Sequence, residues 1–398
     1  MLLKGRAGGD GKLRFPDLTP PEGAWYVELQ TRTPGFIHSI AANAVGQRID
    51  GEEREPNNGG NTANRVDLGE PVVGRVGGDD GADYFWLTTS PEHDEALVAL
   101  RVASEPAVNL TLCLHDSKWR NVQCRSGTTP VALPDLMLGG RDWGISIERA
   151  AETQYRLSLT TQEPITEGRE VEPNDTHAYA TGVPQNFRIK GRFTGKSDKD
   201  FYQIMVTDEP QLWRFHVVGD NLFELAYYDG SEKQRAHLRS TGGRRLRLDN
   251  VFLLPGRHYL RVQGGGGGEY TLLARRLGPP DPNGEVEPND RHNKQRLVAG
   301  QTRTGVSSHE NDLDHYRFFV GNHDHLRLTI TPPADGMLAP NIYWYDGMIG
   351  QGMPRKAGEP MVMQGIFPPG DYHVVLTPRE VSDAQYSISL ERLPRWSC

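Results

Sequence analysis

The sequence predicts an all-β protein built from tandem antiparallel β-sandwich domains, three whole and one partial. Glycine (45) and proline (28) are abundant while long helical or heptad periodicities are missing, which is typical of short strands joined by turns. A set of motifs also recurs three times at nearly constant spacing. The strands that close each recurrence alternate apolar and polar residues, as in a sheet with one buried and one wet face.

Each repeat opens with a Glu-x-Glu-Pro-Asn motif: "EREPNN" at 53–58, and "EVEPND" at 170–175 and again at 285–290. A glycine and then an aspartate that starts an aromatic strand follow the motif. These pairs are Gly74 and Asp83, Gly191 and Asp200, and Gly305 and Asp314. The second glutamate precedes the aspartate by 28, 28 and 27 residues, and the glycine precedes it by 9 each time. Such constant spacing indicates three copies of one folding unit.

The end of each repeat recurs as well. A glycine turn leads into an alternating strand ("GGRDWGISI", "PGRHYLRV", "PGDYHVVL"), and a last strand follows ("QYRLSL", "EYTLLA", "QYSISL"). A unit of about 115 residues with this pattern has the size of a two-sheet sandwich. Linkers rich in Pro and Gly, "TQEPITEGR" and "LGPPDPNG", separate the units. The predicted whole domains are therefore 49–163, 164–278 and 279–398.

Residues 1–48 match only the end of a repeat, beginning at "LTPPEGAWYVEL". We expect them to form the C-terminal part of an incomplete sandwich. This predicts that the chain is a piece of a longer tandem array, or an incomplete reading frame. The first residues lack the apolar core of a secretory signal, so any export signal is expected outside this chain.

Composition narrows the class of partner. A net charge of −8 argues against nucleic acid, which a basic surface would recognise. No apolar run reaches the length needed to span a membrane. Of the three cysteines, Cys113 and Cys124 fall opposite each other when residues are counted outward from a turn at Lys118–Trp119. This spacing predicts a cross-strand disulfide and an oxidising compartment; the alternative is two reduced, partly buried thiols.

The order of the motifs resembles the bacterial pre-peptidase C-terminal (PPC) domain family, and is similar to the collagen-binding domains of clostridial collagenases. The shared pattern is Glu-x-Glu-Pro-Asn-Asp, a Gly, an Asp-aromatic strand, "PG-x-Y" and a closing "Y-x-L" strand. The resemblance implies a jelly-roll-like β-sandwich without a catalytic site, appended to exported bacterial proteins. It also implies that some relatives bind calcium through the motif, and some bind collagen or polysaccharide.

The motif itself is a candidate calcium site. Residues i and i+2 of an extended chain face the same side, so the two glutamates of each motif point together, and oxygen-only donors suit Ca²⁺. The alternative is that the glutamates and the asparagine accept backbone amides and fix the start of the first strand. The candidate ligands are Glu53, Glu55, Asn57, Asp80 and Asp83; Glu170, Glu172, Asn174 and Asp200, with Ser197 or Asp198; and Glu285, Glu287, Asn289, Asn311 and Asp314.

One feature separates the repeats from calcium-binding relatives, in which an acidic or hydroxyl residue follows the glycine. Arg75 and Arg192 take that position in the first two repeats, and Val306 takes it in the third. A guanidinium can form bidentate ion pairs with carboxylates, so these arginines are candidate substitutes for the cation.

No metalloprotease, serine-hydrolase or nucleotide-binding motif occurs, so we expect no enzyme activity. The function predicted is a non-catalytic array from a larger exported bacterial protein, acting as an accessory, spacer or adhesive module. One alternative is a calcium-dependent module that binds a collagen-like protein or a polysaccharide. Another is an accessory region of a secreted peptidase. The expected location is extracellular, at the cell surface or periplasmic.

Overall fold

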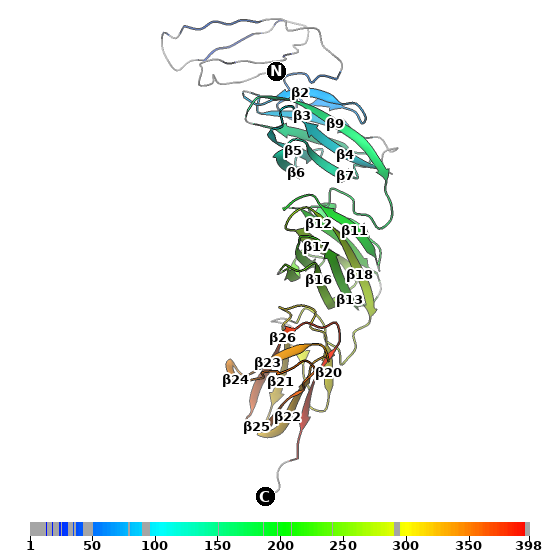
Figure 1. Ribbon diagram of the computed structural model, residues 1–398, viewed down its shortest axis with the longest axis vertical. Helices are drawn as coiled ribbons and strands as arrows, with labels where there is room; N and C mark the ends of the chain where they lie inside the picture. The colour runs from blue at the N-terminus through cyan, green and yellow to red at the C-terminus, as the bar shows by residue number, and fades with distance from the viewer. Residues whose placement is uncertain are drawn as a thin grey trace. The chain divides into compact units, whose positions relative to one another are not determined.

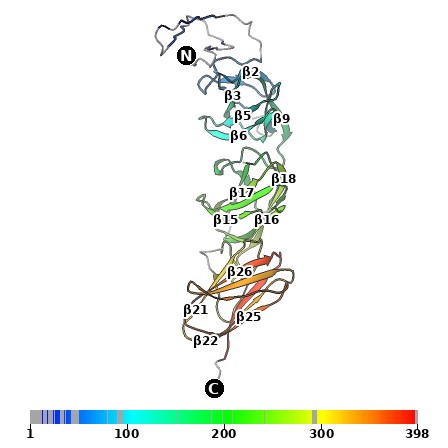
Figure 2. The ribbon, with the colours of Figure 1, turned by 60° about the vertical axis from the view of Figure 1, so that its left-hand side comes forward.

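The computed structural model describes residues 51–394, except 79, 90–95, 150, 186, 197, 208, 241 and 290–294, together with residues 13, 18, 24, 26–30, 35 and 37–42 (Figures 1 and 2). Most of the predicted incomplete sandwich therefore lies outside the described residues. Contacts divide the chain into two compact units, Met1–Glu167 with Val171–Pro173, and Gly168–Glu170 with Asn174–Cys398. The four sequence-based domain boundaries remain predictions.

The described regular structure consists of strands and one short 3₁₀ helix, which confirms the all-β prediction. Each repeat has a five-stranded and a four-stranded sheet, and this pairing is repeated three times along the chain (Figure 1). In the part of the chain described here, no helix is both long and apolar enough to cross a membrane.

The sheets of the first repeat run β1-β3-β8-β5-β6 and β2-β9-β4-β7. The β1–β3 pair is parallel and the others are antiparallel. Phe85 and Ile145 from one sheet and Leu100 and Leu157 from the other are fully buried, so the core lies between the sheets. The strands are β1 Asn64–Val66, β2 Val72–Val76, β3 Ala82–Thr88, β4 Ala96–Ala103, β5 Asn109–His115, β6 Asn121–Thr128, β7 Val131–Leu136, β8 Asp142–Glu148 and β9 Thr153–Pro164.

The second repeat has the same strand order, β10-β12-β17-β14-β15 and β11-β18-β13-β16. Its core is rich in aromatic side chains, among them Tyr202, Trp213 and Phe215. The elements are η2 His177–Tyr179, β10 Thr181–Val183, β11 Arg188–Phe193, β12 Lys199–Val206, β13 Gln211–Gly219, β14 Leu222–Tyr228, β15 Gln234–Arg239, β16 Arg245–Leu253, β17 Gly256–Gly264 and β18 Gly268–Gly278.

The third repeat follows with β19-β21-β26-β23-β24 and β20-β27-β22-β25. Tyr316, Leu328, Val374 and Ile388 are at most 2% exposed in its core. The strands are β19 Gln295–Arg296, β20 Thr302–Gly305, β21 Asp314–Val320, β22 Asp324–Thr331, β23 Met337–Trp344, β24 Gly347–Gln351, β25 Met361–Phe367, β26 Gly370–Glu380 and β27 Tyr386–Arg392.

The hairpin of β5 and β6 contains the predicted disulfide. Cys113 pairs directly with Cys124 in the antiparallel register, and the two sulfurs are bonded. The turn lies at the predicted place: the Trp119 amide donates to the Asp116 carbonyl at 2.9 Å, and Trp119 has a left-handed backbone (φ 60°). The disulfide prediction is confirmed.

Candidate functional site

The opening motif of the first repeat brings acidic side chains together at one end of the sandwich. Carboxylate oxygens of Glu53, Glu55 and Asp83 all lie within 4.8 Å of one another. The glutamates precede β1, and Asp83 is the second residue of β3. All three side chains are buried, with Asp83 fully so, and Asp80 and Asn57 are also buried. The five candidate ligands of this repeat thus lie in one part of the fold, away from water.

The two glutamates of this cluster accept hydrogen bonds from backbone and side-chain donors of the same repeat. Glu53 accepts the backbone N–H of Arg75, the Tyr155 hydroxyl at 2.8 Å and the Asn57 amide at 3.2 Å. Glu55 accepts the backbone N–H of Asn57 at 3.0 Å. The two backbone hydrogen bonds agree with the alternative in which the motif accepts backbone amides, and calcium binding stays a prediction.

The recurring glycine has a packing role in the cluster. Gly74 pairs across the sheet with Tyr155, Gly191 with Tyr270, and Gly305 with Tyr386. A Cβ atom at any of the three would come within 3.0 Å of the tyrosine hydroxyl. Glycine is therefore required for this tyrosine to reach the first glutamate of the motif.

These tyrosines contact the acidic clusters, but the sequence analysis did not include them among the candidate site residues. They occupy the closing "Y-x-L" strand, and that reasoning treated them only as sheet residues. The signal was present, because Tyr155, Tyr270 and Tyr386 recur with the same regularity as the glycines that they face.

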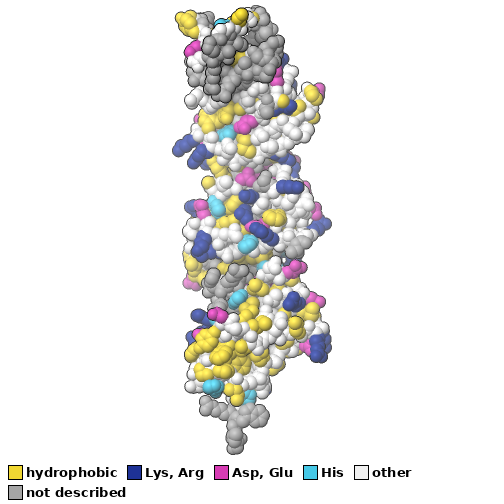
Figure 3. All heavy atoms as spheres, turned by 90° about the vertical axis from the view of Figure 1, so that its left-hand side faces the viewer, with side chains coloured by type: hydrophobic (Ala, Val, Ile, Leu, Met, Phe, Trp, Pro, Cys, Tyr) yellow, Lys and Arg dark blue, Asp and Glu magenta, His cyan; other side chains and the backbone are white. Residues whose placement is uncertain are grey.

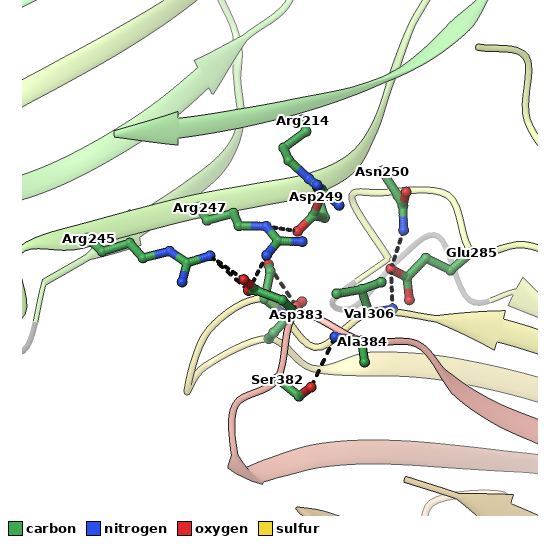
Figure 4. A network of polar contacts seen from close by, with 12 residues as sticks. Arg214, Arg245, Arg247, Asp249, Asn250, Glu285, Val306, Ser382, Asp383 and Ala384 are labelled. Atoms are coloured by element: carbon green, nitrogen blue, oxygen red, sulfur yellow. Dashed lines mark hydrogen bonds and ion pairs between the residues drawn. The ribbon is translucent and has the colours of Figure 1, made fainter. Parts of the chain in front are cut away.

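In the third repeat, carboxylate oxygens of Glu285, Glu287 and Asp314 likewise lie within 4.8 Å of one another. Glu285 accepts the Val306 backbone N–H and the Tyr386 hydroxyl, each at 2.9 Å. Glu285 also accepts a hydrogen bond from the side-chain amide of Asn250, at 2.8 Å (Figure 4). Asn250 belongs to the second repeat. The third cluster therefore shares a hydrogen bond with the preceding repeat.

The second repeat follows the same pattern. Glu170 accepts the Arg192 backbone N–H at 2.7 Å, the Asn174 amide at 3.0 Å and the Tyr270 hydroxyl at 3.0 Å. The same hydroxyl lies 2.6 Å from Asp200 Oδ2. Glu172 is buried. Of the two further candidates, Asp198 accepts the backbone and hydroxyl of Thr194, and Ser197 lies outside the described residues.

The first cluster differs from the other two in its supply of hydroxyl donors. A second tyrosine meets the first in the later repeats, with Tyr202 and Tyr270 hydroxyls 2.5 Å apart and Tyr316 and Tyr386 hydroxyls 2.7 Å apart. The corresponding residue two positions after the aspartate is Phe85, which has no hydroxyl.

The missing hydroxyl affects Asp83. Both of its carboxylate oxygens are buried without a hydrogen-bond partner. The Tyr155 hydroxyl is close enough to Asp83 to lower its pKa as a hydrogen-bond donor would, but its single proton is donated to Glu53 at 2.8 Å. Asp314, by contrast, accepts the Asn289 amide at 3.1 Å and the Ser307 hydroxyl at 3.4 Å.

The electrostatics follow from this burial. Burial raises the pKa of Asp83 to about 11, and the neighbouring charges of Glu53 and Asp80 add to this effect. Burial also raises the pKa of Glu53 to about 7, and burial with the charge of Asp80 raises that of Glu55 to about 8. Burial raises the pKa of Glu285 to about 7 as well. Negative charge in these sites is costly unless a positive charge balances it.

Three sequence-predicted residues lie elsewhere than expected. Arg75 and Arg192 are exposed, and the contact that each makes with the motif glutamate is through its backbone amide. In β11 the buried Gly191 alternates with the exposed Arg192, so the guanidinium points to the opposite face of the sheet. This geometry does not favour a guanidinium in place of a cation. Asn311 is exposed, and its backbone N–H donates to His309 Nδ1 at 3.1 Å.

The second glutamate of each motif also joins consecutive repeats through the backbone. Glu172 forms a parallel bridge with Leu136, Glu287 with Val251, and Glu55 with Leu18. The Glu287 amide donates to the Asn250 carbonyl at 2.9 Å, and the Phe252 amide donates to the Glu287 carbonyl at 3.0 Å. The second and third motifs therefore each open one sandwich and also pair with the outermost strand, β7 or β16, of a four-stranded sheet in the repeat before.

Ion pairs add to this junction between the second and third repeats. Asp383 accepts both Arg245 and Arg247, the former at 2.8 Å, and Arg247 also pairs with Asp249 (Figure 4). Arg247 is only 3% exposed, so its pairing with acids is needed to offset its burial. Of the arginines in β16, Arg247 is thus paired inside the protein, whereas Arg245 is exposed.

A groove of about 410 Å³ lies on the outer face of the five-stranded sheet in the first repeat. The Tyr84, Trp119 and His115 rings line it together with polar side chains that include Asn121 and Glu148. The Trp119 and Tyr84 rings meet edge to face, with centroids 5.2 Å apart. Trp119 lies against Gly60 and Gly144, where a Cβ atom on either glycine would collide with its ring.

Comparisons with known proteins leave the family open. No family model matches the chain, and no curated protein matches it. Among the solved structures that match is the pre-peptidase C-terminal domain of a collagenase from Bacillus anthracis, with 20% identity over 27% of this chain and 100% of that chain, and a TM-score of 0.22. Similarity at this level carries no argument about a site. The assignment of the chain as a tandem β-sandwich protein rests on its own six sheets.

Proposed function

We propose that the chain is a non-catalytic array of accessory β-sandwich modules from a larger exported protein, and that its first repeat binds one Ca²⁺. The observation that carries the calcium proposal is Asp83, whose two oxygens are buried without a hydrogen-bond partner beside Glu53 and Glu55. Oxygen donors from carboxylates and an asparagine carbonyl are the ligands that Ca²⁺ prefers. The bound ion would supply the positive charge that the protein's own donors do not.

The later repeats support the assignment by contrast. There the Tyr270 hydroxyl donates to Asp200, and the Asn289 amide and the Ser307 hydroxyl donate to Asp314. Each of these aspartates therefore has a hydrogen-bond donor on at least one oxygen, whereas neither oxygen of Asp83 has one. We therefore expect a single calcium site per chain. The resemblance to PPC domains agrees with the accessory role, and the spacer and adhesive roles remain open within it.

The experiment is isothermal titration of the metal-free full chain with Ca²⁺, alongside three variants. The expected result is one site, with a dissociation constant on the order of 10⁻⁴–10⁻³ M as in extracellular modules. Asp83→Asn should abolish binding, while the matched change Asp314→Asn in the third repeat should leave it unchanged. Phe85→Tyr restores the missing hydroxyl and should weaken binding at least about tenfold, which corresponds to 1.4 kcal/mol. Binding that survives Asp83→Asn would show that the site is elsewhere.

A second candidate function, recognition of a polysaccharide, is favoured by the groove beside Trp119. Aromatic rings next to amide and carboxylate side chains suit a ligand with apolar faces and many hydroxyls. Affinity electrophoresis through gels containing soluble polysaccharides tests it. Trp119→Asn should abolish retardation, since Asn tolerates the left-handed backbone there, while Trp344→Asn in the third repeat should not. Equal migration of the wild type in every gel would rule this function out.

A further inference from the structure

The third repeat exposes an unusual amount of apolar surface. Yellow side chains gather over this repeat in Figure 3 more densely than over the rest of the face in view. Seven large apolar side chains near β24 and β25 are between 37% and 71% exposed. They are Trp344, Tyr345, Met348, Ile349, Met353, Val362 and Ile366, which we name the apolar edge.

The apolar edge lies on two strands that are outermost in their sheets. β24 ends the five-stranded sheet and β25 ends the four-stranded sheet. The two strands are neighbours, because a Cβ atom on Gly350 would collide with Met363, and one on Gly352 would contact Met361 and Pro340. Both open edges therefore lie on the same side of the sandwich, and each carries backbone N–H and C=O groups that can pair with another strand.

The other two repeats show how such edges are usually protected in this chain. The corresponding strands carry charged residues or proline: "QRAHLR" in β15, "RLRLDNVFL" in β16 and "VALPDL" in β7. The β7 and β16 edges also receive the bridge from the next repeat's motif. In contrast, β24 and β25 read "GMIGQ" and "MVMQGIF", without one charge.

The size of the apolar edge fits a partner of protein dimensions. A large side chain offers on the order of 200 Å² of surface. With the exposed fractions above, the seven side chains present on the order of 800 Å², which is about what each partner contributes to a standard protein interface. Two identical uncharged edges can meet across a two-fold axis without opposing like charges, a requirement of an isologous interface.

We propose that the apolar edge of the third repeat binds the same edge of a second copy of this chain, forming a closed dimer. Pairing would cover the exposed methionine, isoleucine and aromatic side chains and satisfy the open strand edges. Because the contact is isologous, assembly stops at two chains.

Sedimentation velocity of the full chain from about 1 to 100 μM tests the proposal, because interfaces of this size associate with micromolar or tighter dissociation constants. The expected result is a reversible monomer–dimer equilibrium. Val362→Lys with Ile366→Lys should give a monomer at every concentration, and Met348→Lys with Ile349→Lys should do the same from the other strand. The matched control is Leu254→Lys, which changes a side chain 55% exposed in the second repeat and should leave dimerisation intact.

Three outcomes would overturn the proposal. The wild type could remain monomeric at about 100 μM, it could form open-ended oligomers, or Leu254→Lys could dissociate the dimer as much as the edge variants do. Circular dichroism of each lysine variant confirms that its sheets are intact. Two independent pairs of variants ensure that misfolding of one does not decide the result.

Discussion

Replacing Gly74 with alanine would place a methyl group between Glu53 and Tyr155. The added Cβ would lie within 3.0 Å of both the Glu53 carboxylate and the Tyr155 hydroxyl, so one of them must move. Overpacking of this kind costs about 1–3 kcal/mol. Loss of the 2.8 Å hydrogen bond to a buried carboxylate adds about 1.5–3 kcal/mol. The expected loss in the free energy of unfolding of the first repeat is therefore about 2.5–6 kcal/mol.

The assay is hydrogen–deuterium exchange of the full chain, read on peptides from the motif and from β9, together with urea unfolding. Exchange should increase in the first repeat only. Gly81→Ala is the matched control, since Gly81 precedes Asp83 by two residues and a Cβ atom there meets nothing within 4 Å. If Gly74→Ala and Gly81→Ala differ by less than about 0.5 kcal/mol, the usual scatter of surface changes, the packing role assigned to the recurring glycine is wrong.

Three further changes test other parts of the structure. Removing the disulfide as Cys113→Ala with Cys124→Ala should lower the unfolding free energy of the first repeat by up to about 3 kcal/mol, from the entropy of its short loop, and added reductant should then have no further effect in a melt. Burial lowers the pKa of His258 below its ordinary 6.5. The stability that its neutral form contributes is therefore present above pH 6.5 and is lost as the pH falls. In melts from pH 7 to 5, the melting temperature of His258→Phe should decline less than that of the wild type. Asn250 has a left-handed backbone (φ 50°) and donates a hydrogen bond to Glu285. In chemical denaturation, Asn250→Gly should lower the free energy of unfolding by about 1 kcal/mol through the lost hydrogen bond, and Asn250→Ala should lower it further through backbone strain. Equal losses for the two variants would contradict this.

Features that repeat along the chain were predictable from the sequence. The spacing of Gly74, Gly191 and Gly305 from their aspartates indicated one unit copied three times, and the six sheets follow that pattern. The Cys113–Cys124 pair could be placed by counting from the turn, because register in a hairpin is set by its loop.

What depends on contacts between distant segments was not predictable. The sequence "EVEPND" does not indicate that the Glu287 backbone pairs with β16, or that the Asn250 side chain donates a hydrogen bond to Glu285. Asn311 was chosen as a ligand because its spacing before Asp314 matches that of Asp80 before Asp83. In the structure Asn311 is exposed while Asp80 is buried, a difference that the spacing does not reveal. The difference between Phe85 and the tyrosines was visible in the sequence. Its meaning required knowing that the hydroxyls meet at the carboxylates.

The backbone bridge at Glu55, Glu172 and Glu287 has a consequence for how such a chain can grow. The second repeat carries a motif at its start that pairs with the preceding repeat and a strand, β16, near its end that the next motif pairs with. A tandem duplication of about 115 residues of this kind copies both halves of the junction together. A new copy is then compatible with its predecessor from the moment it arises, without any second mutation. A cut made in the proline-rich linkers, by contrast, separates a motif from the strand on which it lies, and a single repeat excised at those points loses a hydrogen-bonded partner that belongs to its neighbour.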